Sequence, residues 1–371
     1  MTEMRKKVGL LFGGRSAEHE VSKLSAANVL RALDPDLYEV IPIGINRDGR
    51  WLLCEGNNHV GTGTSLDIPA EASEIALTPG GAGNVMFLDT TAARSGSPLR
   101  LDLVFPVLHG PNGEDGTVQG LLELARVPYV GSSVTSSAAC MDKDVCKRLL
   151  RDAGLPIVPF LTMTDRSRVD WATAVGVLGA SSLFLKPANL GSSIGVSRAE
   201  TAVEFDRACN QAFRHDRKVV IEKGLAGARE IECAVLEHAS GEICSSSPGE
   251  IMPTGEHSFY TYEAKYLDPD GAAISIPANL SPNQARRVQE LAVKAFQVLG
   301  CEGLARVDFF VGQDADDVMF VNEVNTMPGF TAISLYPKAW EADGLSQKEL
   351  MEVLISHAFA RYERRNVVAG V

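Results

Sequence analysis

The chain has 371 residues, of which 45% are hydrophobic and 22% charged, and this ordinary composition excludes a disordered or fibrous protein. Its length suits two or three compact domains. The formal charge of −12 argues against a nucleic-acid or membrane partner, since such partners need clustered cations. No run reaches the ~18 apolar residues of a spanning helix, and the apolar start predicts a strand in place of a signal peptide, so we expect a cytoplasmic protein.

The first third of the chain alternates strand-like and helix-like runs. This alternation predicts a parallel sheet with helices on its faces. Residues 55–100 are rich in Gly, Ser and Thr and predict loops and short strands. The predicted strands are 7–12, 38–45 and 101–108, and the predicted helices are 16–33 and 114–126.

A second unit begins near Cys140, where the run 141–154 predicts one helix that ends at Gly154. Strands dominate from residue 228 onward, which indicates an α+β architecture. The further predicted strands are 156–162, 182–187, 194–197, 218–223, 229–236, 241–251, 274–280, 305–311 and 317–325. The further predicted helices are 199–214, 281–299 and 347–364.

Two strands near the C-terminus carry the clearest chemical pattern. Side chains two residues apart on a strand share a face, so Arg306 and Asp308 point together, as do Glu323 and Asn325. Hard cations take oxygen ligands alongside phosphates, so this surface predicts a magnesium–nucleotide site. A solvated strand face with a structural Arg306–Asp308 ion pair fits the spacing equally well.

A lysine followed by a Gly/Ser loop forms the second pattern. Lys186 lies on a predicted strand, and Gly191, Ser192, Ser193 and Gly195 follow it. Backbone N–H groups of such a loop can bind phosphate oxygens, and the lysine adds a positive charge. The residue order excludes a P-loop. A plain Gly-rich hairpin is the alternative.

A third, weaker pattern lies at the end of the first strand. Glu18 follows a glycine turn and falls in the first turn of a predicted helix, where the helix dipole favours a carboxylate. A simple cap explains it as well as a ligand does. The Rossmann Gly-x-Gly-x-x-Gly pattern is missing, which argues against a dinucleotide site here. The seven scattered cysteines predict buried or half-buried free thiols.

Taken together, several segments resemble signatures of the D-alanine–D-alanine ligase family, and they cover nearly the whole chain in the family's order. They are GGRSAEHEVS (13–22), HGPNGEDGTVQG (109–120), YVGS (129–132), MDK (141–143), KPANLGSSIGVS (186–197), YEAKY (262–266) and NEVNTMPGFTAISLYPK (322–338). The resemblance implies a multidomain ATP-grasp fold with ATP between its last two domains. These are an N-terminal parallel-sheet α/β domain over 1–139, a small central domain over 140–226, and a C-terminal domain over 227–371 with a mobile loop at about 245–267.

The resemblance also implies the nucleotide site. Lys143 and Lys186 would hold phosphates, with Ser193 in the phosphate loop. The run 221–230 would bind adenine through the backbone near Lys223 and Leu225, with Glu222 nearby, and Glu230 would take the ribose hydroxyls. The implied metal ligands are Asp308, Glu323 and Asn325, which would hold two Mg²⁺ ions, with Mn²⁺ as a substitute.

The implied substrate residues surround two D-alanine molecules. Glu18, Ser192 and Tyr266 would form a triad at the first substrate, and Lys265 would reach the transferred phosphate. Arg306 and the Gly329 N–H would stabilise the oxyanion, and Ser334 with the Leu335 backbone would hold the second carboxylate. His109 would either lie near the first substrate or only order its loop.

The activity implied is ATP-dependent ligation of two D-alanine molecules through an acyl phosphate, for peptidoglycan precursors, by a homodimer. A different ATP-grasp ligase, such as a D-alanine–D-lactate ligase, is one alternative, although the Lys265–Tyr266 pair favours the dipeptide product. A catalytically silent nucleotide-binding protein is the other, because folds outlive activities.

Overall fold

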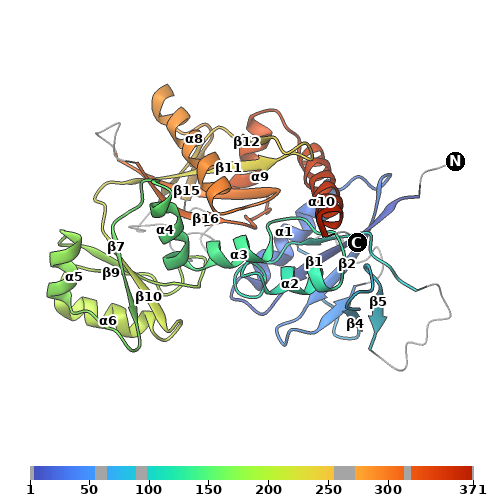
Figure 1. Cartoon of the computed structure of the whole chain (residues 1–371), viewed down its shortest axis with the longest axis horizontal. Coiled ribbons are helices and arrows are strands. Elements are labelled where there is room, and N and C mark those ends of the chain that lie inside the picture. The colour runs from blue at the N-terminus through green and yellow to red at the C-terminus, as the bar shows by residue number, and fades with distance from the viewer. Residues whose placement is uncertain (1–3, 55–64, 89–97, 255–271, 313–318, 370–371) are drawn as a thin grey trace.

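The computed structural model describes residues 4–54, 65–88, 98–254, 272–312 and 319–369. They form three sheets with helices packed on them (Figure 1). Within the described ranges, no helix is both long and apolar enough to cross a membrane.

The first sheet has the strand order β5-β4-β3-β2-β1-β6. Only β1 pairs in parallel, with β2 on one side and β6 on the other, and the remaining pairs are antiparallel. The predicted parallel sheet is therefore confirmed for three strands and extended by an antiparallel edge. The strands are β1 (Lys6–Gly13), β2 (Tyr38–Ile45), β3 (Trp51–Leu53), β4 (Ser73–Leu77), β5 (Val85–Phe87) and β6 (Leu103–Pro106), with helices α1 (His19–Ala32), α2 (Thr117–Leu124) and α3 (Val134–Met141).

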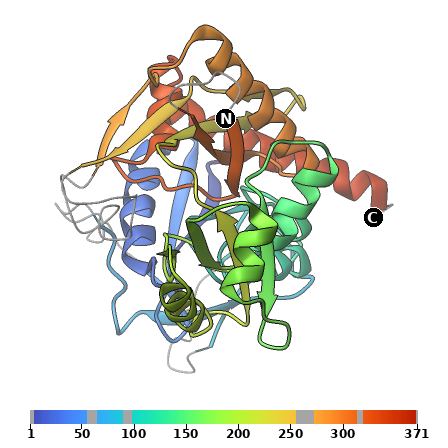
Figure 2. The same cartoon turned by 90° about the vertical axis from the view of Figure 1, so that its left-hand side faces the viewer.

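The second sheet is antiparallel, with the order β7-β10-β8-β9, and lies at one end of the molecule, nearest the viewer in Figure 2. Its core forms where Phe205 of the covering helix packs with Leu185 and Val219 of the strands. The elements are β7 (Phe160–Thr164), β8 (Leu183–Pro187), β9 (Ser197–Ala199), β10 (Lys218–Lys223), α5 (Trp171–Leu178) and α6 (Ala202–Ala212).

The third sheet has the order β14-β13-β11-β15-β16, and β12 also pairs with β11. Helix α8 begins in a capping box between Ser281 and Gln284 and buries one apolar face against this sheet. The strands are β11 (Arg229–Glu237), β12 (Ile243–Ser245), β13 (Gly249–Pro253), β14 (Ala272–Ser275), β15 (Leu304–Val311) and β16 (Met319–Asn325), with helices α4 (Lys143–Asp152), α8 (Pro282–Val298), α9 (Leu335–Ala342) and α10 (Gln347–Ala369).

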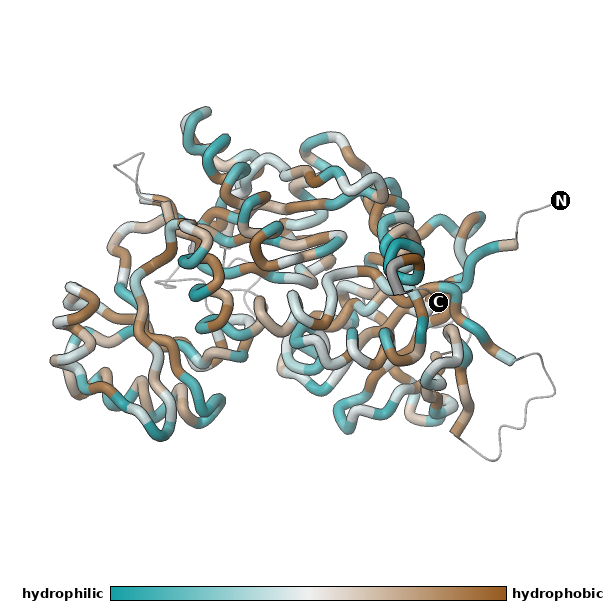
Figure 3. The backbone as a smooth tube through the Cα atoms, viewed as in Figure 1, coloured by the Kyte–Doolittle hydropathy of each residue, from teal (hydrophilic) through white to brown (hydrophobic). Residues whose placement is uncertain are grey.

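The first and third sheets share one core. Leu10 and Phe105 of the first sheet belong to the same buried cluster as Leu304, Tyr336 and Leu354. Figure 3 shows hydrophobic residues along the strands, whereas the exposed end of α8 is hydrophilic. Because these strands pack on a common interior, the loops at their ends are held in fixed relative positions.

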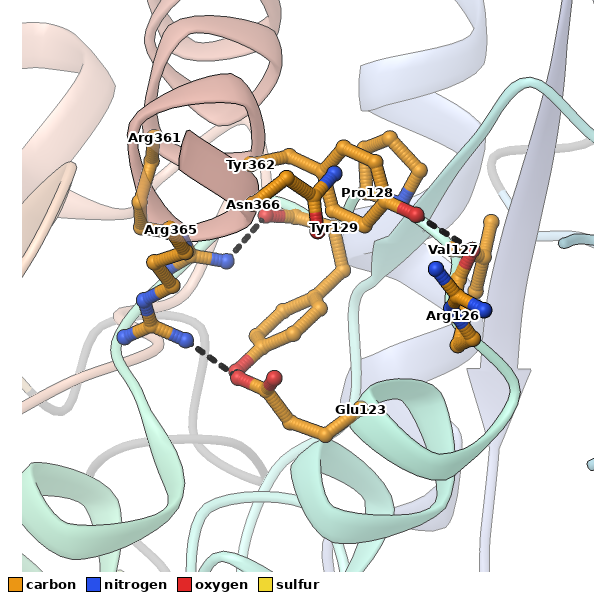
Figure 4. Close-up of a pocket in the computed structure, with 9 residues that line it drawn as sticks. All are labelled: Glu123, Arg126, Val127, Pro128, Tyr129, Arg361, Tyr362, Arg365 and Asn366. Atoms are coloured by element: carbon orange, nitrogen blue, oxygen red, sulfur yellow. Dashed lines mark hydrogen bonds and ion pairs between the residues drawn. The ribbon is translucent and has the colours of Figure 1, made fainter. Parts of the chain in front are cut away.

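Helix α10 also contacts the segment that follows α2, through the buried side chain of Arg361. The Arg361 guanidinium stacks 4.2 Å from the Tyr129 ring centroid and donates to the Tyr129 carbonyl at 2.7 Å. Arg365 forms ion pairs with Glu123 and Glu302 beside a small hollow (Figure 4). None of the predicted site residues that the structure describes lines this hollow.

Two predicted elements were wrong in detail. The helix predicted over 141–154 is α4, which begins only at Lys143, because Asp142 is extended and its side chain caps α4 by accepting from the N–H groups of Asp144 and Val145. Helix α3, which ends at Met141, was not predicted. The strand predicted over 194–197 begins only at Ser197. The left-handed φ of Gly195, +74°, cannot belong to a strand.

Other differences concern elements that the periodicity did not reveal. Helices α5 and α9 were not predicted, and each is only eight residues long.

Strand β13 is paired on both sides, so the loop predicted over 245–267 is not a loop at its start. The rest of this predicted loop, residues 255–267, lies outside the described residues. Helix α4 packs its Cys146 and Leu150 into the core of the third sheet.

Candidate active site

Strands β15 and β16 place four polar side chains on one face. Arg306 lies opposite Asn325 in the register, and Asp308 lies opposite Glu323. The Arg306 guanidinium binds Asp308 through two hydrogen bonds of 2.7 Å, and the Asn325 amide donates to Asp308 at 3.0 Å. The intervening residues Val307, Phe309 and Val324 are buried on the other face, as predicted.

This face fits a divalent cation. Two carboxylates directly opposite each other repel, and a hard cation bound by oxygen atoms would remove that repulsion. Asp308 is nearly buried, so its charge needs compensation. Arg306 provides part of it and also lies 3.0 Å from Glu232, a carboxylate that the sequence did not single out. Asp308, Glu323 and Asn325 thus remain the predicted magnesium ligands.

A β-bulge at this point aims a further residue at the lysine-bearing strand. Asp308 pairs with Glu323 and Phe309 pairs with Val321, which leaves Asn322 as the extra residue. The Asn322 amide oxygen accepts a hydrogen bond of 3.3 Å from the Lys186 ammonium. Sequence reasoning missed Asn322, because strict alternation along the strand gives it no special place.

A buried charge cluster lies next to this contact. The Glu222 carboxylate sits 2.8 Å from the Lys147 ammonium and 2.6 Å from that of Lys186. Burial alone would raise the pKa of Glu222, but the two ammonium groups outweigh it and hold the pKa at about 2. Glu222, Lys147 and Lys186 together carry one net positive charge in a nearly dry site. An anionic ligand would balance this charge.

Lys147 was not predicted, although its position gave a signal. It follows Lys143 by four residues on α4, so both lysines face the same side of the helix. Lys143 donates to the Leu190 carbonyl at 2.6 Å and lies 3.5 Å from the Glu323 carboxylate. The acidic strands and the lysine-bearing loop therefore meet.

The Gly/Ser loop is a run of left-handed turns. Ser192, Ser193 and Gly195 have φ values of +51°, +57° and +74°. The Ile194 N–H donates to the Gly191 carbonyl at 3.1 Å, which closes the first turn. Turns of this kind can group backbone N–H groups around an anion.

Glu18, which directly precedes α1, links the elements of the first sheet to the Gly/Ser loop. The Ser192 hydroxyl donates to the Glu18 carboxylate, as the predicted triad requires. A Cβ on Gly110 would lie 2.7 Å from Glu18 Oε2, and one on Gly191 would lie 3.1 Å from it, so two glycines leave the space for this carboxylate. Tyr266, the third member of the triad, and Lys265 lie outside the described residues.

Glu114 is a further carboxylate near Glu18 that sequence reasoning missed. It accepts a hydrogen bond of 2.6 Å from the Gly110 N–H. Burial and the Glu18 carboxylate raise the pKa of Glu114 to about 8. Its place within the GEDG run, between a predicted site histidine and a helix, gave a weak signal.

His109 has protein partners at both ring nitrogens. Nδ1 lies 3.1 Å from the Met327 carbonyl oxygen and Nε2 lies 3.0 Å from Ser25 Oγ. Burial lowers the pKa of His109. This geometry favours the loop-ordering role over a direct substrate contact.

Gly329 and Ser334 lie side by side. A Cβ on Gly329 would come within 2.7 Å of Ser334 Oγ, and that oxygen accepts the Thr331 N–H at 3.0 Å. Ser334 immediately precedes α9, so the Leu335 N–H is in the first turn of a helix, where the dipole favours a carboxylate.

The predicted adenine segment follows strand β10. The Lys223 N–H is bonded to the Pro159 carbonyl at 3.1 Å, so a backbone contact from Lys223 would use its carbonyl. Leu225 lies in the loop between β10 and β11. Glu230 is on β11, opposite Phe310 of β15. Lys223 directly follows Glu222 on β10, so this segment borders the Glu222 cluster.

Three sheets in this arrangement, with Lys143 of α4 and Lys186 of the second sheet meeting the acidic strand pair of the third, define an ATP-dependent ligase of the ATP-grasp class. A family model described as D-ala D-ala ligase N-terminus matches residues 7–132, and one described as D-ala D-ala ligase C-terminus matches residues 149–356. The chain belongs to the D-alanine–D-alanine ligase family and is a peptide-bond-forming ligase.

Individual relatives agree with this family. The chain is 61% identical to a D-alanine–D-alanine ligase B of Bradyrhizobium diazoefficiens, with 100% of this chain and 98% of the relative covered. It is 44% identical to D-alanine–D-alanine ligase A of Escherichia coli K12, with 98% of each covered.

Solved structures are similar over nearly the same length. The D-alanine–D-alanine ligase from Coxiella burnetii has a TM-score of 0.83 and 36% identity, over 98% of this chain and 97% of that one. The VanG D-Ala:D-Ser ligase from Enterococcus faecalis has a TM-score of 0.82 and 34% identity, over 96% and 100%.

Proposed function

We propose that the chain joins two D-alanine molecules into D-alanyl-D-alanine at the expense of ATP, as a step in making peptidoglycan precursors. The observation that carries this proposal is the meeting of Lys143, Glu323 and the Gly/Ser loop at one point. Such a point can hold a triphosphate between cations and metal-binding oxygens. The full-length identity to D-alanine–D-alanine ligases supports the choice of substrate.

In the first step, a carboxylate oxygen of the first D-alanine attacks the γ-phosphorus, and the bond from that phosphorus to the ADP oxygen breaks. An acyl phosphate forms. Lys143 and Lys186 balance phosphate charge, and Lys265 is proposed to reach the transferred group. When bound by Asp308, Glu323 and Asn325, two Mg²⁺ ions, or Mn²⁺ in their place, would neutralise the β- and γ-phosphates.

In the second step, the free amine of the second D-alanine attacks the acyl carbon. The carbon–nitrogen bond forms, the carbon–oxygen bond to phosphate breaks, and the amine releases a proton. Arg306 and the Gly329 N–H are proposed to stabilise the oxyanion, and each such donor contributes about 2.7–4 kcal/mol. Arg306 is fixed for this role by its two bonds to Asp308.

The substrates are proposed to be held at opposite ends of the site. Glu18, supported by Ser192 and Tyr266, takes the first ammonium. Ser334 and the Leu335 N–H take the second carboxylate at the start of α9. A loop that includes 255–267 would exclude water, which matters because an acyl phosphate hydrolyses readily.

Three further features belong to the proposal. The protein acts as a homodimer, it is cytoplasmic, and its domains divide near residues 140 and 227. Helix α4 shares a core with the third sheet, although it lies within the proposed central domain. The boundary near residue 140 is therefore the one to test. Limited proteolysis and sedimentation would examine the boundaries and the dimer.

Acceptor competition tests the proposed product. The enzyme is given ATP, Mg²⁺ and D-alanine with an equal concentration of D-lactate or D-serine at several pH values, and the products are resolved by mass. We expect D-alanyl-D-alanine to dominate near neutral pH. Dominant depsipeptide or D-alanyl-D-serine would overturn the choice of acceptor, and Mg–ATP binding without phosphate release would indicate a silent nucleotide-binding protein.

A further inference from the structure

A buried hydrogen-bond chain connects helix α1 to segment 327–330. Ser25 on α1 is fully buried, and His109 is 5% exposed. His109 Nε2 lies 3.0 Å from Ser25 Oγ, and its Nδ1 lies 3.1 Å from the Met327 carbonyl oxygen. The Phe330 N–H donates to Ser25 Oγ at 3.1 Å. The hydrogen bonds of His109 and Ser25 therefore hold both ends of segment 327–330.

The direction of each hydrogen bond follows from its partners. The Met327 carbonyl can only accept, so His109 Nδ1 carries the hydrogen. A neutral ring then has a lone pair on Nε2, which accepts from the Ser25 hydroxyl. The Ser25 oxygen is left to accept from Phe330, so all the groups in the chain are satisfied.

Segment 327–330 contains Gly329, whose N–H is the proposed donor to the oxyanion. Met327 and Phe330 are both buried, so their carbonyl and N–H would be costly to leave unpaired. We infer that Ser25 is a positioning residue for ligation, which acts through His109 to fix the 327–330 backbone and aim the Gly329 N–H. The inference rests on the proposed role of Gly329.

The same helix supplies a matched control. Ser22 lies one turn earlier and is also fully buried. Its hydroxyl accepts the Gly13 N–H at 2.8 Å and donates to the Val107 carbonyl at 2.5 Å. Both partners belong to the first unit, so Ser22 has the same chemistry as Ser25 without a link to segment 327–330.

The test compares Ser25→Ala with Ser22→Ala in the full-length enzyme. Both should lower the Tm to a similar extent. We expect kcat of Ser25→Ala to fall about tenfold or more, because small misplacements of a catalytic group are costly, with KM for ATP unchanged within about twofold. Ser22→Ala should keep kcat within about threefold of the parent. Equal losses of kcat in the two variants would overturn the inference.

A second measurement is made on the parent enzyme and does not depend on whether Ser25→Ala folds. ¹⁵N NMR of the histidine ring, assigned by the signal lost in His109→Gln, should show Nδ1 protonated and Nε2 bare at pH 7 in the parent enzyme. The opposite tautomer or a doubly protonated ring would overturn the inference. A parent enzyme that makes no dipeptide would instead defeat the proposed function, while the tautomer could still be read.

Discussion

The Lys143 ammonium lies 3.5 Å from the Glu323 carboxylate and 2.6 Å from the Leu190 carbonyl oxygen. Helix α4, the Gly/Ser loop and strand β16 therefore meet at one side chain. A cation held between a carboxylate and the Gly/Ser loop fits the proposed binding of a nucleotide with its metal.

Glu323→Gln tests the metal assignment. Gln keeps the volume but loses the charge that would hold Mg²⁺, and the lost stabilisation of several kcal/mol should lower kcat by about 100-fold or more. The Glu323 side chain is 28% exposed, so the Tm should stay close to that of the parent. Phosphate release with D-alanine gives the rate, and an unchanged rate would contradict the assignment.

Gly110→Ala tests the space left for Glu18. Gly110 has a φ of +75°, and its new Cβ would lie 2.7 Å from Glu18 Oε2. We expect displacement of Glu18 and a KM for D-alanine that rises about tenfold or more, with nucleotide affinity retained.

Gly154→Ala is the control for this variant. Its φ of +73° imposes the same backbone strain, but a Cβ there meets nothing within 4 Å. It should lose stability without a change in the KM for D-alanine. Kinetic effects of equal size in both variants would show that strain, and not the contact with Glu18, is responsible.

Glu222→Gln should destabilise the protein by about 3–5 kcal/mol at pH 7, because it leaves the buried Lys147 and Lys186 without their counter-charge. The exposed pair of Arg198 and Glu200 gives the control, since Glu200→Gln should cost less than about 1 kcal/mol. Urea unfolding measures both free energies.

The pKa of Glu222 adds a pH dependence with a definite sign. It lies at about 2 in the folded protein, below the ordinary 4.5, so the stabilisation by Glu222 is present above pH 4.5 and is lost as the pH falls toward 2. The difference in stability between the parent and Glu222→Gln should therefore be smaller at pH 3 than at pH 7. A constant difference would argue against this ion cluster.

Glu114→Gln should change the pH dependence in the opposite direction. The pKa of Glu114 is raised from 4.5 to about 8 in the folded protein, so the folded state binds the extra proton between these values. Stability from this group is present below pH 4.5 and is lost as the pH rises through 8. The variant should gain stability relative to the parent from pH 5 to pH 9. If the two proteins keep the same difference in stability over this range, the raised pKa of Glu114 is disproved.

The strand pair that carries Arg306, Asp308 and Glu323 could be predicted because period-two alternation is a local property of the sequence. Strand β10 was also predicted with the bounds observed, since its β-branched residues are flanked by polar ones. The family motifs identified the Gly/Ser loop and Glu18, whose contact joins residues 174 positions apart.

What could not be predicted depends on long-range packing or on local irregularity. Lys147 and Glu222 come together only when α4 packs beside the second sheet, and nothing local to either residue indicates the other. The bulge at Asn322 breaks the alternation from which strand faces are read. Ser25 is one of two serines in α1, and only its contacts with His109 and Phe330, both distant in sequence, distinguish it.

The central claim is that one site transfers phosphate from ATP to D-alanine and then uses the acyl phosphate to form the dipeptide. The most direct test supplies D-alanine labelled with ¹⁸O in its carboxylate, together with Mg–ATP, and analyses the released phosphate and the dipeptide by mass spectrometry. We predict one ¹⁸O atom in phosphate for each D-alanyl-D-alanine formed. Dipeptide formation with unlabelled phosphate would contradict the account.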